Sequence, residues 1–251
     1  GNMFTISSEN PVSFFDIKIS STVSKSANAA IYYDAGATKQ NNYSVIDNCI
    51  FENQFNGIYC YRNAYQKISN NHFLFNTASG TSIHIENATS VDAGDQVVSF
   101  NQIYGGSGVI GVHHRSGGGL RLIGNKFLQI QNGYYAQFTG TAQSGIGVIS
   151  GNSFDGCTNQ SIVITTEDTA ILTDMSITNN IFGGSPTQAF MYLEQAGSSS
   201  LGRVAITGNT VIQNSGSVDI ITLTNVGQVS VTGNSFSGSG DITIGSGCSV
   251  C

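Results

Sequence analysis

The chain has no tryptophan, two prolines and few charged residues, and each shortage excludes a class of protein. Charged residues make up 10% of the 251, against about a quarter in ordinary soluble domains. Only nine residues are lysine or arginine and the formal net charge is −6, so no basic cluster could neutralise a run of phosphates and no nucleic-acid partner is expected. No apolar run approaches the roughly 20 residues of a membrane-spanning helix, so no membrane insertion is expected.

Cysteine is also scarce, and its spacing carries little chemistry. Five cysteines cannot all pair within one chain, and they match neither a disulfide framework nor a four-ligand zinc site. The only CxxC spans Cys248 to Cys251, without the following helix pattern that a redox motif needs. We therefore expect buried free thiols, no metal and no cofactor.

What the chain has instead is a composition suited to strands and turns. It contains 31 glycines and long stretches rich in Ser, Thr and Asn. All of these residue types are poor helix formers. Hydrophobic residues make up 39%, with ten tyrosines and fourteen phenylalanines, which is enough to build a core. The composition favours an all-β protein over a helical bundle or a disordered chain.

A repeat organises the whole sequence. The pattern apolar-x-x-Asn-x-apolar occurs eight times, with successive asparagines 23 to 30 residues apart. Its asparagines are Asn48, Asn71, Asn101, Asn125, Asn152, Asn180, Asn209 and Asn234. A fixed motif at variable spacing indicates one structural turn per repeat, with the length differences absorbed in loops.

A second short strand follows each asparagine. The segments 58–61, 83–86 and 110–113 alternate apolar and other residues, which is typical of strands with one buried face. Recurring strands without helices predict a single right-handed parallel β-helix of about nine coils over residues 1–251. We expect each repeat asparagine to adopt the left-handed turn conformation and to stack into an amide ladder. The Gly or Asn before it, at 124, 151, 179, 208 and 233, should serve the same turn.

The Gly-Asn-x-apolar turns at 151–154, 208–211 and 233–236 resemble those of the right-handed parallel β-helix, or pectate-lyase-like, superfamily. Its members include pectate lyases, polygalacturonases, alginate epimerases and the tailspike depolymerases of bacteriophages. Low charge and polar loops make this chain most similar to the tailspike branch. That resemblance implies an extracellular homotrimer, on the virion tail if phage-encoded, that binds and depolymerises bacterial capsule or O-antigen polysaccharide. The chain would then be a fragment of a longer tailspike-like protein, because no assembly module follows the last coil.

Other functions stay open. If the protein is an enzyme, glycoside hydrolysis is favoured over elimination. The alternatives are a non-catalytic glycan-binding adhesin, a structural fibre segment, and a secreted enzyme similar to pectate lyases or epimerases. The last lacks support from motifs, since the sequence shows neither paired aspartates with Gly-His-Gly nor an acidic calcium cluster.

Outward side chains of stacked strands should form columns, because neighbouring strands lie roughly 4.8 Å apart. Alternation predicts one column of Tyr61, Glu86, His113, Thr139, Thr165, Glu194 and Thr224. It predicts a parallel column of Tyr59, His84, Gly111, Gln137, Val163, Tyr192 and Thr222. Aromatic, acidic and basic groups converge at one end of this face. The predicted substrate-binding residues there are Tyr59, Tyr61, Arg62, His84, His113 and Arg115.

Glycoside hydrolysis needs two carboxylates, and few are available. One candidate set is Glu86 with Asp92 or Asp95. Another is Glu167, Asp168 and Glu194 on adjacent coils. A homotrimer is expected to cover apolar side chains on this face, namely Val163, Phe190 and Tyr192.

Overall fold

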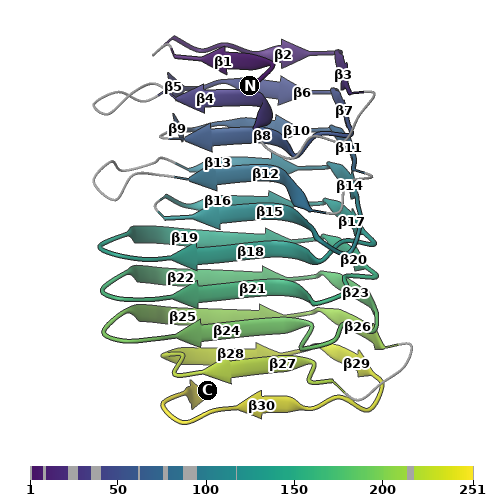
Figure 1. The fold of residues 1–251 in the computed structure, drawn as a ribbon. Coiled ribbons are helices and arrows are strands. Elements are labelled where there is room, and N and C mark those ends of the chain that lie inside the picture. The colour runs from purple at the N-terminus through teal and green to yellow at the C-terminus, as the bar shows by residue number, and fades with distance from the viewer. Residues whose placement is uncertain are drawn as a thin grey trace.

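The protein is a parallel β-solenoid whose coils stack from the N-terminal end to the C-terminal end (Figure 1). The computed structural model describes residues 2–7, 10–21, 28–34, 41–61, 63–75, 79–86, 95–116, 118–213 and 218–250. Throughout these segments every regular element is a strand, and no helix is present to cross a membrane. The predicted all-β solenoid is confirmed. Two predicted site residues, Arg62 and Asp92, lie outside the described residues.

Three long sheets form the faces of the solenoid. Sheet A has ten strands: β1 (Phe4–Ile6), β4 (Ala29–Asp34), β8 (Asn56–Tyr61), β12 (Gly80–Glu86), β15 (Val109–Arg115), β18 (Asn132–Phe138), β21 (Gln160–Thr166), β24 (Met191–Gln195), β27 (Ile221–Thr224) and β30 (Ile242–Ile244). Sheet B has ten: β2 (Phe14–Phe15), β6 (Val45–Asp47), β10 (Lys67–Ser69), β13 (Gln96–Ser99), β16 (Leu120–Ile123), β19 (Gln143–Ser150), β22 (Ile171–Thr178), β25 (Ser200–Thr207), β28 (Gln228–Thr232) and β31 (Ser249–Val250).

Sheet C completes the coil, which runs from sheet B through sheet C to sheet A. Its nine strands are β3 (Lys18–Ser20), β7 (Ile50–Glu52), β11 (His72–Leu74), β14 (Gln102–Tyr104), β17 (Lys126–Leu128), β20 (Ser153–Asp155), β23 (Ile181–Gly184), β26 (Thr210–Gln213) and β29 (Ser235–Ser237). A short extra pair joins β5 (Asn41–Asn42) to β9 (Asn63–Ala64). Because strands stack in parallel register, side chains one coil apart become neighbours.

The corner between sheets B and C contains the predicted amide ladder. Its members are Asn71, Asn101, Asn125, Asn152, Asn180, Asn209 and Asn234. The first six donate from Nδ2 to Oδ1 of the next asparagine at 2.9–3.0 Å. All seven donate to a main-chain carbonyl at 2.8–3.0 Å. The ladder therefore satisfies polar groups that the turn buries.

Two details of the predicted turn are wrong. Asn48 is not a ladder residue: Ile46 pairs with Ile68, so Cys49 takes the ladder position and its amide donates to Asn71 Oδ1 at 2.9 Å. Nor do the ladder asparagines adopt the left-handed conformation. The residue before each one does, as at Asn70 with φ 57° and Gly124 with φ 66°. The left-handed residue turns the chain, which leaves the following asparagine to point inward.

Stacked phenylalanines from sheet C fill much of the interior. Phe127 and Phe154 stack with centroids 4.7 Å apart, and Phe154 stacks on Phe182 at 5.1 Å. Glycines of sheet A make room for these rings, since a Cβ on Gly133 would lie 2.3 Å from Phe154 Cδ1. The close packing of this core fixes the shape of sheet A, whose outer face carries the candidate site.

Candidate functional site

The outer face of sheet A carries a column of aromatic rings. Register pairing aligns Tyr32, Tyr59, His84, His113 and Tyr135 on successive strands from β4 to β18. Neighbouring ring centroids lie 5.2, 4.3, 4.6 and 5.1 Å apart along this aromatic column. Alternation in the sequence put these side chains outside, and stacking between coils orders them into one ridge.

A polar column runs beside the aromatic column, two residues further along each strand. It consists of Asp34, Tyr61, Glu86, Arg115 and Gln137. The predicted placement of His113 beside Glu86 is wrong, because His113 pairs with His84 and Arg115 takes the place next to Glu86. Such a slip of two residues keeps every side chain on its predicted face. Alternation determines the face of a residue but not its partner on the next strand.

On β18 the predicted register is again wrong by two residues, in the opposite direction. In the column of Glu86, the β18 position expected for Thr139 is taken by Gln137, which pairs with Arg115. In the column of His84, the position expected for Gln137 is taken by Tyr135, which pairs with His113. Sequence reasoning therefore missed Tyr135, and it also missed Tyr32 at the other end of the aromatic column. The alternation of Ile31, Tyr32 and Tyr33 was the available signal for the latter.

Glu86 is the centre of the polar contacts on this face. The Tyr59 hydroxyl donates to its Oε2, and His84 Nε2 lies 3.3 Å from the same oxygen. Arg115 Nη1 lies 3.3 Å from Oε1. The contact with His84, followed by those with Tyr59 and Arg115, outweighs partial burial and lowers the pKa of Glu86 to about 2. Glu86 is therefore ionised at neutral pH.

Its neighbours are held in defined protonation states as well. Burial, followed by the proximity of His84 and Arg115, lowers the pKa of His113 to about 3, so this imidazole is neutral at neutral pH. Burial, followed by the hydrogen bond to Glu86, raises the pKa of Tyr59, which keeps its hydroxyl as a donor. The site offers the outward edges of stacked rings, one carboxylate and one guanidinium. This set suits recognition of a polar ring better than proton transfer by Glu86.

The second predicted carboxylate set lies further along sheet A. Glu194 pairs with Thr165 and accepts a hydrogen bond from the Tyr192 hydroxyl at 2.9 Å. Glu167 follows β21 and accepts from Gln137 Nε2 at 3.3 Å. The register places the Cα atoms of Glu167 and Glu194 roughly 8 Å apart, from the spacing along and between strands.

The remaining predicted acid lies elsewhere. Asp95 is exposed and directly precedes β13 of sheet B, where Arg121 Nη2 lies 3.9 Å from its Oδ2. Within the described part of the chain no contact joins it to Glu86. Over the same residues, no group of three or more His, Cys, Asp or Glu could hold a metal ion.

The apolar residues expected to be exposed are mostly buried, which corrects the prediction. Val163 is 4% exposed and Phe190 is fully buried. Val163 does point outward, but it lies between Tyr135 and Tyr192 on the neighbouring strands. Phe190 packs edge-on against Phe182 with ring centroids 6.4 Å apart. Both side chains are therefore already buried within the chain, without a partner subunit.

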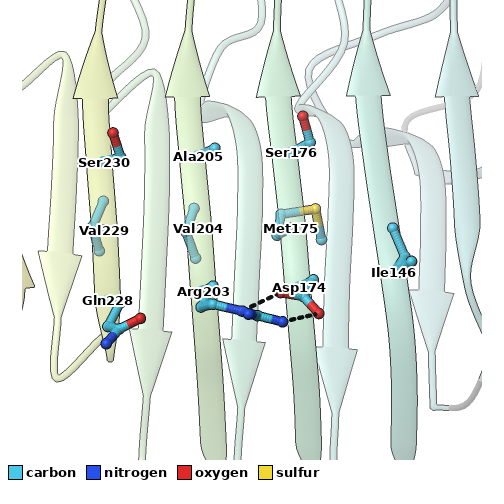
Figure 2. A pocket seen from close by; sticks show the side chains of 10 residues that line it. All are labelled: Ile146, Asp174, Met175, Ser176, Arg203, Val204, Ala205, Gln228, Val229 and Ser230. Atoms are coloured by element: carbon cyan, nitrogen blue, oxygen red, sulfur yellow. Dashed lines mark hydrogen bonds and ion pairs between the residues drawn. The ribbon is translucent and has the colours of Figure 1, made fainter. Parts of the chain in front are cut away.

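A separate hollow of about 320 Å³ lies over sheet B, between β19 and β28 (Figure 2). Ile146 at its edge is 64% exposed. The single acid in the lining, Asp174, is held by Arg203 through two hydrogen bonds of 2.6 and 3.0 Å. The ten lining residues include no aromatic ring, so this hollow offers neither a stacking surface nor a carboxylate without a partner.

Three comparisons with known proteins identified no relative of this chain. Protein-family models, curated proteins and solved structures gave no match to the chain. The functional argument therefore depends on the geometry of sheet A.

Proposed function

We propose that the outer face of sheet A binds a bacterial surface polysaccharide. The observation that carries this proposal is the aromatic column beside the Glu86–Arg115 pair. The outward edges of the Tyr59 and His84 rings, which stack on each other, can pack against the apolar faces of sugar rings. The carboxylate and guanidinium can accept from and donate to sugar hydroxyls. A flat ridge that follows the solenoid axis suits an extended polymer.

Binding is better supported than cleavage at Glu86. A general acid in glycoside hydrolysis needs a raised pKa, whereas the pKa of Glu86 is lowered to about 2. In this proposal Glu86 serves as a hydrogen-bond acceptor that holds Tyr59 and Arg115 in place.

Depolymerisation is the second candidate, and Glu167 with Glu194 are the residues that favour it. Their roughly 8 Å Cα spacing is compatible with two carboxylates on either side of a sugar, as in an inverting hydrolase. Each accepts a hydrogen bond from a neutral donor, Gln137 and Tyr192 respectively. A lyase or a structural fibre would not need this pair.

A panel of capsular and O-antigen polysaccharides tests both candidates. Retention on immobilised glycan measures binding, while reducing ends and unsaturated products report hydrolysis and elimination. We expect Tyr59→Ala to weaken retention at least tenfold and Gln228→Ala, in the sheet B hollow, to leave it unchanged. Glu194→Gln should abolish any cleavage but keep retention. Equal retention by Tyr59→Ala and the parent protein would contradict the proposed binding face.

We also propose that the parent protein acts outside the cell as a homotrimer, on the virion tail if it is phage-encoded. The support is the resemblance of the Gly-Asn turns at 208–211 and 233–236 to the tailspike branch. Sedimentation velocity of the full-length parent tests it. A trimeric mass is expected, and a stable monomer at micromolar concentration would contradict the proposal.

A further inference from the structure

A small hollow lies at Tyr192 on β24, two strands beyond the end of the aromatic column at Tyr135, and includes residues that precede β24 and β27. Its volume is about 270 Å³, and its lining comprises Gln160, Gln188, Ala189, Tyr192, Val218, Asp219 and Thr222. Register pairing from His84 through β15, β18 and β21 places Tyr192 in line with the aromatic column. The hollow and the Glu86 contacts therefore belong to one continuous face.

The lining combines a ring with hydrogen-bonding groups. Tyr192 is fixed by its hydroxyl, which donates to Glu194 Oε2 at 2.9 Å, so its ring has a set orientation. Asp219 Oδ2 accepts from Thr222 Oγ1 at 3.2 Å, and a carboxylate has lone pairs on both oxygens to accept from a ligand. The amides of Gln160 and Gln188 add donors and acceptors. One ring face with a carboxylate and two amides suits a hydroxyl-bearing or amine-bearing ring.

Charge narrows the class of ligand. The lining contains one carboxylate, Asp219, and no lysine or arginine. Across the described strands of sheet A the carboxylates are Asp34, Glu86 and Glu194, against Arg115 as the one lysine or arginine. Arg115 is itself engaged by Glu86. A glycan that carries carboxylates would therefore meet like charge along most of the face.

We propose that the Tyr192 hollow is a second sugar subsite for the same glycan that contacts Tyr59 and His84, and that this glycan is uncharged or amine-bearing. The inference rests on the proposed function. From β12 to β24 the sheet advances four strands, or roughly 19 Å at the usual spacing between strands. Only an oligosaccharide long enough to span that distance can occupy both places.

A length series of oligosaccharides tests the inference. Sized fragments of an uncharged O-antigen polysaccharide, from disaccharide to decasaccharide, are titrated by calorimetry into the full chain. We expect affinity to rise steeply once a fragment spans both places. Tyr192→Ala should remove that rise, so that long fragments bind at least tenfold more weakly than to the parent protein. The affinity for short fragments should stay unchanged. Tyr59→Ala should lower the affinity for fragments of every length.

Charge selection is measured with a second probe. Oligogalacturonates of matching length should bind at least tenfold more weakly than the uncharged fragments. Because Tyr192 also covers Val163, the variant Asp219→Asn provides a test that keeps the ring in place. It removes one negative charge, so it should raise the affinity for long oligogalacturonates. The affinity for short oligogalacturonates should stay unchanged.

The outcomes separate the two proposals. If Tyr192→Ala binds long uncharged fragments as tightly as the parent protein does, the second subsite is overturned. If oligogalacturonates bind as tightly as uncharged fragments, the proposed charge class of the ligand is overturned. In both cases the proposed binding at Tyr59 stands. If Tyr59→Ala has no effect and Tyr192→Ala does, the proposed primary site is wrong and the subsite at Tyr192 is supported. Failure of every fragment to bind overturns both.

Discussion

Glu86 and Arg115 lie opposite one another on adjacent strands, with 3.3 Å between Oε1 and Nη1. They come from positions 29 residues apart in the chain, and only the stacking of β12 on β15 brings them together. The pair neutralises the one lysine or arginine among the described strands of sheet A. It also helps to hold the carboxylate ionised at neutral pH.

Glu86 should make stability depend on pH in a defined window. Its pKa is lowered from the ordinary 4.5 to about 2, so its contribution is fully present above about 4.5 and is lost as pH falls through about 2. Glu86→Gln should lower the free energy of unfolding by about 2 kcal/mol at pH 7, after allowance for partial exposure. Urea unfolding at pH 7 and pH 2.5 should show this difference shrinking. A difference that stays constant with pH would contradict the assigned pKa.

The amide ladder should be a major source of stability. Asn152 Oδ1 accepts from Asn125 at 2.8 Å, and its Nδ2 donates to Leu122 O at 2.8 Å and to Asn180 Oδ1 at 2.9 Å. Asn152→Ala leaves these buried partners unsatisfied and should cost about 3 kcal/mol. Asn48→Gly is the control, since Asn48 is exposed and glycine readily adopts its φ of 53°. Thermal unfolding should show little change for Asn48→Gly, and equal losses for both variants would contradict the ladder assignment.

The position of Cys49 offers a gain of stability. Its Sγ lies 3.7 Å from Phe14 O, the carbonyl to which a ladder amide in this coil would donate. Cys49→Asn should add a hydrogen bond there and another to Asn71 Oδ1, which makes it about 1 kcal/mol more stable than Cys49→Ala. Denaturant midpoints of the two variants measure the difference. A less stable Cys49→Asn would mean that the ladder cannot extend into this coil.

Tight packing between sheets A and C predicts a matched pair of glycine variants. A Cβ at Gly133 would lie 2.3 Å from Phe154 Cδ1, whereas a Cβ at Gly145 would meet nothing within 4 Å. Gly133→Ala should therefore cost about 1–3 kcal/mol through overpacking. Gly145→Ala should be close to neutral. Calorimetric melting temperatures that fall equally for both would contradict the packing described for the core.

The solenoid and its faces could be predicted from sequence because the repeat has a simple physical cause. Alternation fixed the outward direction of Tyr59, His84 and Glu86, since period two is the geometry of a strand with one buried face. The asparagine motif located the corner of the coil because a buried ladder needs the same side chain in successive turns. These are local patterns that recur.

The pairing between coils could not be predicted in the same way. Coils differ in loop length, so aligning the alternating segments 83–86 and 110–113 placed His113 next to Glu86 instead of Arg115. The burial of Val163 depends on Tyr135 and Tyr192, which belong to other coils. Asn48 fitted the sequence motif, yet the register of β6 gives the ladder position to Cys49. Each miss concerns a relationship between strands that only the stacked structure determines.

A crystal structure with a bound oligosaccharide tests the central claim most directly. Crystals of the chain would be soaked with an uncharged O-antigen octasaccharide selected from the retention panel. The account predicts sugar rings over sheet A, packed against the outward edges of Tyr59 and His84 and extending toward Tyr192. Sugar hydroxyls are expected to form hydrogen bonds with Glu86 and Arg115. Sugar density over the sheet B hollow at Ile146, or along the asparagine corner, with sheet A left empty, would contradict it.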